Sequence, residues 1–409
     1  MKKGFYWLLW LIAFAAGAYG VYQRLVFGHT LAGYNSYIPW GLWVAAYIYF
    51  IGLSAGAFLL STLVYVFGLK TFARVGKLAL FTALVTLIAA LLTIWFDIGH
   101  MERFWKVFAR PNFGSMMAWM VWLYTAYFLL LIVELWTALR ADLVAWGDRP
   151  GFVGALARFL SLGSRDVSAA ALKRDAARLK ILGSIGVPLA IAFHGGVGAL
   201  FGVVEARPYW NSSLYPVMFL ISALLSGSAL LTFLVSFFWP RGEEGAWREL
   251  VGNLGRIVLG LLALDVILQI SEFLVGLYST APAHRGVYQE LAAGSGAWLF
   301  WGVMVVLGML IPAILLVVGP SSPKTVGVAT LLIVLSFLAL RYNIVVPGLT
   351  SSPLPGLAQA YIEPRLSFHY VPTSMEWLVL LFNASLAILL LALGLSYLPL
   401  TTASKEVHL

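Results

Sequence analysis

Six ionisable side chains sit within or at the ends of long apolar stretches, and these residues are the best placed to do chemistry. They are Asp97, Glu134, His194, Asp265, Glu272 and Glu376. A charged side chain in hydrocarbon costs about 2.5–3.5 kcal/mol on insertion scales, so it normally has a partner or a function. Carboxyl and imidazole groups in such surroundings are suited to holding and transferring protons.

The spacing of these residues places several proton-exchanging groups on common helix faces. Asp265, Gln269 and Glu272 are spaced i, i+4 and i+7, so they share one face of a helix. Thr82, Thr86, Thr93 and Asp97 share one face of the span 75–98. Tyr127 and Glu134 share one face of the span 114–139. We interpret these faces as a proton path formed by Thr82, Thr86, Thr93, Glu134, Asp265 and Gln269.

The depth of each acid follows from the rise of about 1.5 Å per helical residue. Asp97, His194 and Glu272 then fall in the outer part of their helices, and Glu376 opens the last span at the same side. These four residues are expected to form one group if their helices are neighbours. Asp265 lies deeper, near the middle of the membrane.

Structural alternatives exist for the residues of the first half. Asp97 could cap its helix or pair with Arg103. His194, on an apolar and Gly-rich helix, could be a satisfied core histidine, and Glu134 could reach the interface by snorkelling. The threonines could simply bond back to their own helices.

The acids of the second half have an alternative of their own. Asp265 and Glu272 could each form a structural pair with Arg256 or Arg341. Such a pair would satisfy the buried charge without any chemistry. The sequence alone leaves both readings open.

Composition places the residues above in a membrane. Of 409 residues, 61% are hydrophobic and only 11% are charged, against about 25% charged in soluble domains. Ten stretches reach the roughly 20 apolar residues that a span needs: 5–27, 39–69, 75–98, 114–139, 181–204, 214–238, 254–278, 297–318, 326–346 and 374–398. The predicted fold class is an all-α integral membrane protein with about ten transmembrane helices.

The basic residues predict the orientation. Most of the 26 Lys and Arg residues fall in connectors on one side, which places both termini in the cytoplasm. The net charge of +9 is therefore explained by basic residues that set the orientation and contact anionic lipid, rather than by nucleic-acid binding. Lys2 and Lys3 with the following apolar run could be a signal peptide, but the run continues to Phe27, so an uncleaved first helix is expected.

A weak internal repeat predicts the domain organisation. Residues 54–57 and 226–229 are both runs of small residues, and Asp97 and Glu272 end their spans at a similar offset. We expect one polytopic domain over 1–409, with four-helix bundles at 39–204 and 214–346, flanked by the first helix and the last helix at 374–398. Small residues also serve close helix packing, which is the simpler explanation of the runs.

Two long connectors carry further expectations. The basic stretch 170–180 within the inner connector 140–180 is amphipathic and is expected to lie on the membrane surface. The outer connector 347–373 is rich in Pro, Gly and Ser and is long for a link. It is either a docking surface or a cap over the bundle.

Missing residue types exclude several kinds of cofactor. The chain has no Cys, so cysteine-ligated iron–sulfur clusters, disulfides and thiol catalysis are excluded. Of its six His residues only His194 is well inside a span, which disfavours paired haem ligands. No metal-ligand spacing, nucleotide motif or serine-hydrolase motif is present.

Together these segments resemble the NrfD/polysulfide reductase membrane subunit family, in its ten-helix branch that includes the hydrogenase-2 type. The matching motifs occur in order at 39–43, 97–105, 194–200, 207–212, 272–273, 341–343 and 370–377. One departure concerns the end of the third span, where many relatives have Asp-Leu-Gly-Arg-Pro. Here Asp97 and Gly99 remain, but His100 stands in place of the Arg.

The resemblance implies a quinone-reactive anchor subunit without a redox cofactor of its own. Its substrate would be menaquinone or ubiquinone. Its partners would be a ferredoxin-like iron–sulfur subunit docked on the outer face and a large catalytic subunit, such as a molybdopterin enzyme or a hydrogenase. The membrane would be the cytoplasmic membrane of a bacterium or archaeon, and turnover would allow proton translocation.

Quinone chemistry then gives the candidate residues their expected roles. Asp97 and His194, followed by Glu272, are the candidates for carbonyl contact and proton exchange. The other expected quinone contacts are His100, Trp40, Trp43 and Glu376. The competing function is a secondary transporter or ion channel with an acidic site at mid-membrane, favoured by the apparent repeat and by Pro188 within a span. A purely structural anchor is the third possibility.

Overall fold

The computed structural model describes residues 2–240, 244–354, 356–360, 363 and 365–401. The C-terminal residues 402–409, which were expected on the cytoplasmic side, lie outside the described residues. Within the described ranges the chain is helical and has no β-strand. The predicted all-α class is therefore confirmed.

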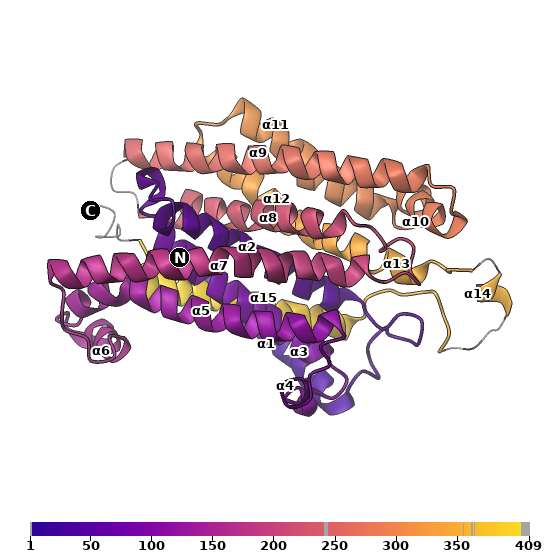
Figure 1. Cartoon of the computed structure of the whole chain (residues 1–409), viewed down its shortest axis with the longest axis horizontal. Coiled ribbons are helices and arrows are strands. Elements are labelled where there is room, and N and C mark those ends of the chain that lie inside the picture. Colours follow the sequence, from indigo (N-terminus) through magenta and orange to yellow (C-terminus); the bar gives the residue numbers. More distant parts are fainter. Residues whose placement is uncertain (1, 241–243, 355, 361–362, 364, 402–409) are drawn as a thin grey trace.

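In the described part of the chain, ten helices are long and apolar enough to cross a membrane, as the sequence predicted. They are α1 (Lys2–Phe27), α2 (Leu42–Tyr65), α3 (Gly76–Asp97), α5 (Met116–Trp146), α7 (Ala169–Gly202), α8 (Tyr215–Phe238), α9 (Glu244–Leu277), η3 with α11 (Leu299–Leu310 and Ile311–Val318), α12 (Pro323–Val345) and α15 (Ser374–Tyr397). The chain is a multi-pass integral membrane protein. The long axes of these helices run roughly side by side (Figure 1).

Short helices occupy the connectors at the two ends of the bundle. They are η1 (Lys70–Phe72), η2 (Met101–Arg103), α4 (Lys106–Ala109), α6 (Gly151–Leu160), α10 (Pro282–Ala293), α13 (Pro347–Thr350) and α14 (Leu357–Ala360). Figure 1 shows α10, α13 and α14 at one end and α6 at the other. We call these the α14 end and the α6 end.

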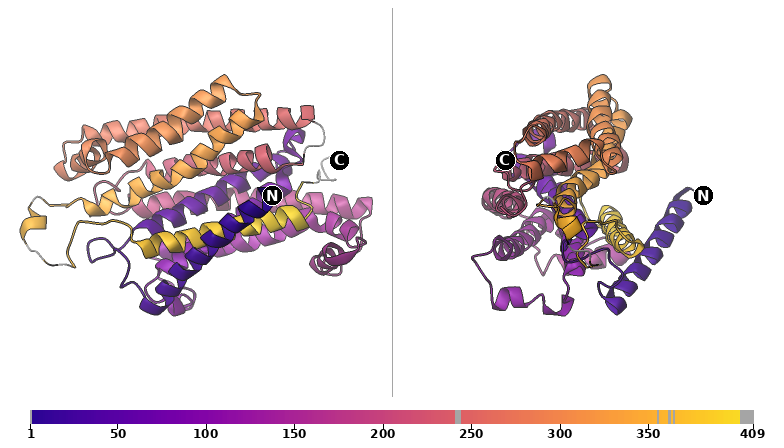
Figure 2. Two further views of the ribbon diagram at one scale, coloured as in Figure 1. Left: turned by 180° about the vertical axis from the view of Figure 1, so that it is seen from behind. Right: turned by 90° about the vertical axis from the view of Figure 1, so that its right-hand side faces the viewer.

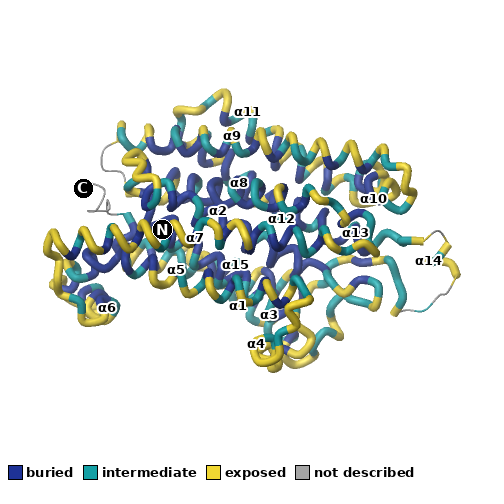
Figure 3. Tube along the Cα trace, in the orientation of Figure 1, coloured by how far each residue is buried: buried dark blue, intermediate teal, exposed yellow. Residues whose placement is uncertain are grey.

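The centre of the bundle is built on α2, which packs against α3, α7, α8 and α12. Its crossing with α8 is very close, since a Cβ at Gly56 would lie 2.0 Å from the Ala223 carbonyl oxygen. A Cβ at Gly227 would lie 2.4 Å from the backbone nitrogen of Ala57. The two runs of small residues noted in the sequence therefore face each other and let the backbones touch. Figure 3 shows α2 and α8 as largely buried.

The first and last helices form a pair at the edge of the bundle. α1 packs against α15, and α15 in turn packs against α3 (Figure 2). Gly17 and Gly20 of α1 lie directly against the backbone of α15. This pairing brings the last turn of α1 and the first turn of α15 to the α14 end of α3.

One expectation about the α6 end was wrong. Residues 170–180 do not form a separate surface helix but are the first turns of α7, which runs unbroken from Ala169 to Gly202 through Pro188. The segment is rich in Ala, Leu, Lys and Arg, which are strong helix formers, so nothing ends the helix there. The buried Arg140 of α5 also donates to Asp175 at 2.6 Å and holds this segment against α5.

Candidate functional site

Among the described residues, Asp97, Glu376, Asp265 and Glu272 are divided among three separate groups of polar side chains. One lies at the α14 end between α1, α3 and α15, one lies in the interior between α7, α8, α9 and α12, and one lies on α9 beside α10. We call the first the Asp97 cluster, which consists of Arg24, Tyr34, Asp97, Tyr370 and Glu376. The predicted group of outer acids is thus divided rather than brought together.

Asp97 is the last residue of α3, and two neighbouring side chains fix its position. The Tyr34 hydroxyl donates to the Asp97 carboxylate at 2.7 Å. The buried Arg24 donates to the carbonyl oxygens of Phe96 and Ile98, both at 2.7 Å. A cation at the carbonyl end of a helix is favourable, so Arg24 both closes α3 and gives Asp97 a nearby positive charge.

Glu376 is the second acid of the cluster and is fully buried at the start of α15. Its carboxylate accepts from the backbone N–H groups of Gly33 at 3.0 Å and Thr373 at 2.9 Å. Thr373 and Glu376 thereby form a capping box, which begins α15. The Tyr370 hydroxyl also donates to Glu376 and accepts from the Leu42 N–H at 2.7 Å.

The two tyrosines join the two acids. The Tyr34 and Tyr370 rings are stacked with centroids 6.1 Å apart. Burial, followed by the charges of Asp97 and Glu376, holds the pKa of Tyr34 well above its ordinary value of 10.0. Burial and Glu376 likewise raise the pKa of Tyr370. Both phenols are therefore protonated donors at neutral pH.

His29 and Trp43 complete the wall beside Tyr34. The Trp43 ring is fully buried, and its N–H donates to the Glu376 carbonyl at 3.0 Å. The His29 ring lies 5.5 Å from the Tyr34 ring and 5.9 Å from the Trp43 ring. Burial and the charge of Arg24 lower the pKa of His29, so it is neutral at pH 7. Its Nε2 is buried and has no hydrogen-bond partner among the described residues.

Three of the expected quinone contacts lie outside this cluster, namely His100, Trp40 and His194, which belongs to the interior group described below. His100 is exposed, and its nearest acid is Glu102 at 3.3 Å. Trp40 stacks on Trp210 with centroids 5.6 Å apart, on the side of the connector that faces α7 and α8. Arg103 contacts Glu102 at 3.3 Å, so the pairing with Asp97 that was considered is not formed.

The interior group is centred on the buried Arg341 of α12. Arg341 donates to the Ser222 hydroxyl at 2.5 Å and lies 4.7 Å from the centre of the Phe219 ring. Asp265 and His194 are fully buried and close enough to interact electrostatically with this guanidinium. Of the two arginines considered as partners of Asp265, Arg341 is therefore the neighbour.

The remaining residues of the predicted proton path are spread through the first four helices. Glu134 is fully buried on α5, and neither carboxylate oxygen has a hydrogen bond within the described part of the chain. The Tyr127 hydroxyl lies 3.3 Å from the Ser54 hydroxyl. The Thr86 and Thr93 hydroxyls donate to carbonyls four residues earlier in α3, which is the structural alternative. Thr82 is buried on the same helix.

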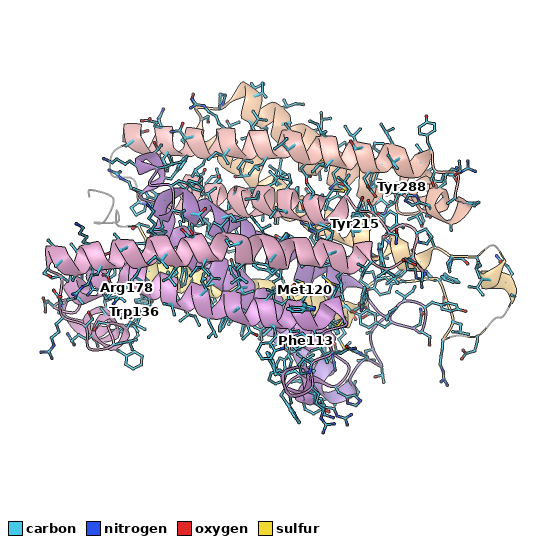
Figure 4. The ribbon with its side chains drawn as sticks, in the orientation of Figure 1. Phe113, Met120, Trp136, Arg178, Tyr215 and Tyr288 are labelled. Atoms are coloured by element: carbon cyan, nitrogen blue, oxygen red, sulfur yellow. The ribbon has the colours of Figure 1, made fainter. Side chains whose placement is uncertain are left out.

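The third group of polar side chains is centred on Glu272 and lies apart from Asp97. Its carboxylate accepts from the Ser212 hydroxyl at 3.0 Å and from the Tyr288 hydroxyl at 3.3 Å. Glu272, Gln269, Tyr215 and Tyr288 all line a cavity of about 400 Å³. Figure 4 shows Tyr288 on α10 and Tyr215 near the start of α8, on the same side of the molecule.

Comparison with known proteins identifies the family. A family model described as "Polysulphide reductase, NrfD" matches residues 30–352. The chain belongs to the NrfD family. This match runs from the connector before α2 to the end of α13, and it confirms the resemblance found in the sequence motifs.

This NrfD-family protein is similar in sequence to oxidoreductase subunits of three organisms. It is 38% identical to a selenate reductase subunit of Mesobacillus selenatarsenatis, over 100% of this chain and 96% of that one. It is 27% identical to the Hdr-like menaquinol oxidoreductase integral membrane subunit of Archaeoglobus fulgidus, over 95% and 92%. It is 28% identical to a polysulfide reductase chain of Wolinella succinogenes, over 78% and 97%.

Proposed function

We propose that this protein is the membrane anchor subunit of a respiratory oxidoreductase complex and that it binds quinone at the Asp97 cluster. The relatives support the class, because they are named as parts of selenate and polysulfide reductases and of a menaquinol oxidoreductase. The cluster supports the site, because it combines a carboxyl group with hydrogen-bond donors beside aromatic walls.

The observation that carries the proposal is the hydrogen bond from Tyr34 to Asp97 next to the unbonded Nε2 of His29. A quinone ring has two carbonyl oxygens that accept hydrogen bonds and take up one proton each on reduction. Tyr34 orients one carboxylate oxygen of Asp97 and leaves the other available. His29 offers a second polar atom near the same aromatic wall, and Trp43 holds that wall in place through its bond to α15.

The chemistry assigned to these residues is proton exchange. Reduction of one quinone to quinol consumes two electrons and two protons, and oxidation of quinol releases them. Asp97 is the group that gives or receives a proton at the ring oxygen, because it is half-buried between the donor Tyr34 and the cation Arg24. Electrons come from or go to a partner subunit, since the protein has no Cys.

The partner is placed at the α14 end, against the connectors that surround the Asp97 cluster. We propose an iron–sulfur subunit there, joined to a large catalytic subunit, as the family resemblance implies. Phe104, Trp105 and Phe108 are large exposed side chains of one connector, and Arg103 and Lys106 lie beside them. An apolar patch with basic residues at its edge is typical of a protein contact. The α14 end would face the outside of a bacterial or archaeal cytoplasmic membrane.

Protons would reach the cluster from the α6 end through Glu134 and the Arg341 group. Neither carboxylate oxygen of Glu134 has a hydrogen-bond partner in the described structure, so this group would exchange protons through bridging water. Uptake from the α6 end with electrons supplied at the α14 end would generate a membrane potential. Pro188 lies in an unbroken α7, so the broken helix that favoured a transporter is absent from this described span.

The test is quinone turnover by the purified complex that carries Asp97→Asn. Asn keeps the shape of the side chain and the bond to Tyr34 but cannot exchange the proton. We expect turnover to fall by about 10²–10⁴-fold, the usual contribution of a general acid or base, while the complex stays assembled on native gels. The control is Asp148→Asn, which changes an exposed Asp beyond the end of α5. Normal turnover in Asp97→Asn would overturn the site.

A further inference from the structure

The cavity beside Glu272 is separate from the Asp97 cluster. It lies between α9, η3 and α12 and has a volume of about 400 Å³, within the range of roughly 300–1,000 Å³ found for small-molecule sites. Its polar groups, Gln269, Glu272 and Asn343, are few, and the rest of its wall is almost entirely apolar. Such a site takes a ligand that is mostly apolar and has a small polar head.

The cavity opens toward the lipid rather than toward water. Ile270, Trp301 and Leu310 contribute to its lining, yet 53%, 45% and 52% of their surface is exposed. They lie in helices that are long and apolar enough to cross a membrane, so we expect their exposed surface to face acyl chains. A ligand therefore reaches this cavity sideways from within the bilayer.

The wall of the cavity has an unusual backbone and a flat face. Residues Leu299–Leu310 form a π-helix, a wider helix that is rare and is often found at functional sites. Phe300 of this segment stacks on Phe273 of α9, with centroids 5.2 Å apart and planes 21° from parallel. Met304 lies on the same lining. Flat aromatic and thioether surfaces suit a planar ring.

The polar end of the cavity favours a neutral acceptor. The amide nitrogen of Asn343 has only a long contact to the Met304 sulfur at 3.6 Å, which leaves N–H donors available for a carbonyl. Among the described residues that line the cavity there is no Lys or Arg, and Glu272 would repel a phosphate. A phospholipid headgroup therefore fits poorly, whereas a ring with carbonyl groups fits well.

We propose that this cavity is a second binding site for the headgroup of an isoprenoid quinone, distinct from the site at Asp97. The ring lies against Phe273, Phe300 and Met304, one carbonyl accepts from the Asn343 amide, and the tail leaves past Trp301 into the bilayer. The proposal concerns binding alone and involves no electron transfer. It rests on the proposed function only in assuming that the protein meets quinone in its membrane.

The test uses an azido-naphthoquinone with a short isoprenoid tail, added to the intact complex in nanodiscs of phosphatidylethanolamine and phosphatidylglycerol. After illumination, mass spectrometry locates the label on the protein. We expect label on residues 262–277, 299–313 or 340–344, and we expect excess menaquinone, but not excess phospholipid, to remove it. Label confined to other residues, or competition by phospholipid instead, would overturn the proposal.

A matched pair of variants tests the location. Val266→Phe fills the cavity from its α9 wall, whereas Val275→Phe makes the same change on an exposed face of the same helix. We expect the label in this region to fall about tenfold or more in Val266→Phe, because the ring and the new side chain cannot both fit. Val275→Phe should keep it. Asn343→Leu, which retains the side-chain size, should lower it by about fivefold through the loss of one hydrogen bond. Unchanged labelling in both Val266→Phe and Asn343→Leu would overturn the proposal.

Asp97→Asn separates the two sites. Label in the cavity should persist in this variant even though turnover is lost. Cavity label together with normal turnover in Asp97→Asn would leave this inference standing and would overturn the proposed function. Loss of cavity label in Asp97→Asn would show that the two sites are one and would overturn the inference.

Discussion

Asp97 and Glu272 lie near the same end of the bundle, each close to the end of its helix, yet their surroundings differ. Asp97 is held by α1 and α15, which bring Arg24 and Glu376 to it. Among the described residues, Glu272 accepts from the Ser212 and Tyr288 hydroxyls alone, and it borders an apolar cavity that opens to lipid.

The neighbouring helices therefore determine what a carboxyl group at this level of the bundle can do. The pair formed by α1 and α15 closes the space beside α3 with charges and hydrogen bonds, which suits proton exchange. Beside α9 the neighbouring wall is the π-helical η3, and a cavity remains. Substitutions at one of the two acids should therefore leave the other unaffected.

After Asp97→Asn itself, the largest effect is expected from removing the phenol that orients Asp97. Tyr34→Phe deletes the hydroxyl that donates to this carboxylate, so we expect quinone turnover of the complex to fall by about 10²-fold. The matched change Tyr288→Phe deletes the hydroxyl that donates to Glu272 and should leave turnover within about twofold. Equal losses in the two variants, measured by quinol oxidation or quinone reduction, would erase the distinction between the two acids.

A smaller effect is expected on stability from the cation that closes α3. Arg24→Met removes a charge at the carbonyl end of a helix and leaves two carbonyls unbonded, so we expect a loss of about 2 kcal/mol in the free energy of unfolding. Arg103→Met, at an exposed position, should cost less than about 0.5 kcal/mol. Denaturation of the detergent-solubilised protein measures both. A similar loss in both variants would contradict the claim that Arg24 stabilises the end of α3.

Glu272→Gln should have a still smaller effect on turnover. Ser212 and Tyr288 bond to different oxygens of Glu272, so Gln keeps one acceptor and offers an amide N–H to the other hydroxyl. Gln has no exchangeable acid proton, and we expect turnover within about threefold of the native complex. A loss of about 100-fold or more would show that Glu272, like Asp97, exchanges protons during turnover.

The smallest effect is a pH dependence of stability at His29. Its pKa is lowered in the folded protein by burial and Arg24, so the folded state binds fewer protons than the unfolded state near pH 6.5. The stability that this residue contributes is complete above pH 6.5 and is lost as the pH falls through the folded value. We expect His29→Gln to reduce the slope of melting temperature against pH below 6.5. No change in His29→Gln would contradict the buried neutral imidazole.

Composition alone predicted the ten spans, because a bilayer demands long apolar helices. It could not locate the ends of α5, α7 and α9, which extend to Trp146 and begin at Ala169 and Glu244. These extra turns mix charged residues with Ala and Leu, which form helices well, and the charges interrupt the apolar run that marks a span.

The site was predictable only in part. Asp97, Trp43 and Glu376 were expected as quinone contacts, and the structure brings them together. Tyr34 and Tyr370 were missed because they lie in connectors without periodicity, and the bond from the Leu42 N–H to Tyr370 joins positions 328 residues apart. Depth along a helix placed Glu272 at the level of Asp97 but gave no information on its position around the bundle.

The density of a quinone bound to the intact complex tests most directly whether quinone binds at Asp97. Electron cryo-microscopy of the complex reconstituted with menaquinone should show a ring beside Tyr34 and His29, with one oxygen within hydrogen-bond distance of Asp97. That density should disappear when Trp43→Ala removes the wall. A ring seen only in the cavity beside Glu272, with lipid or protein at Asp97, would contradict the central claim that Asp97 is where this protein exchanges protons with quinone.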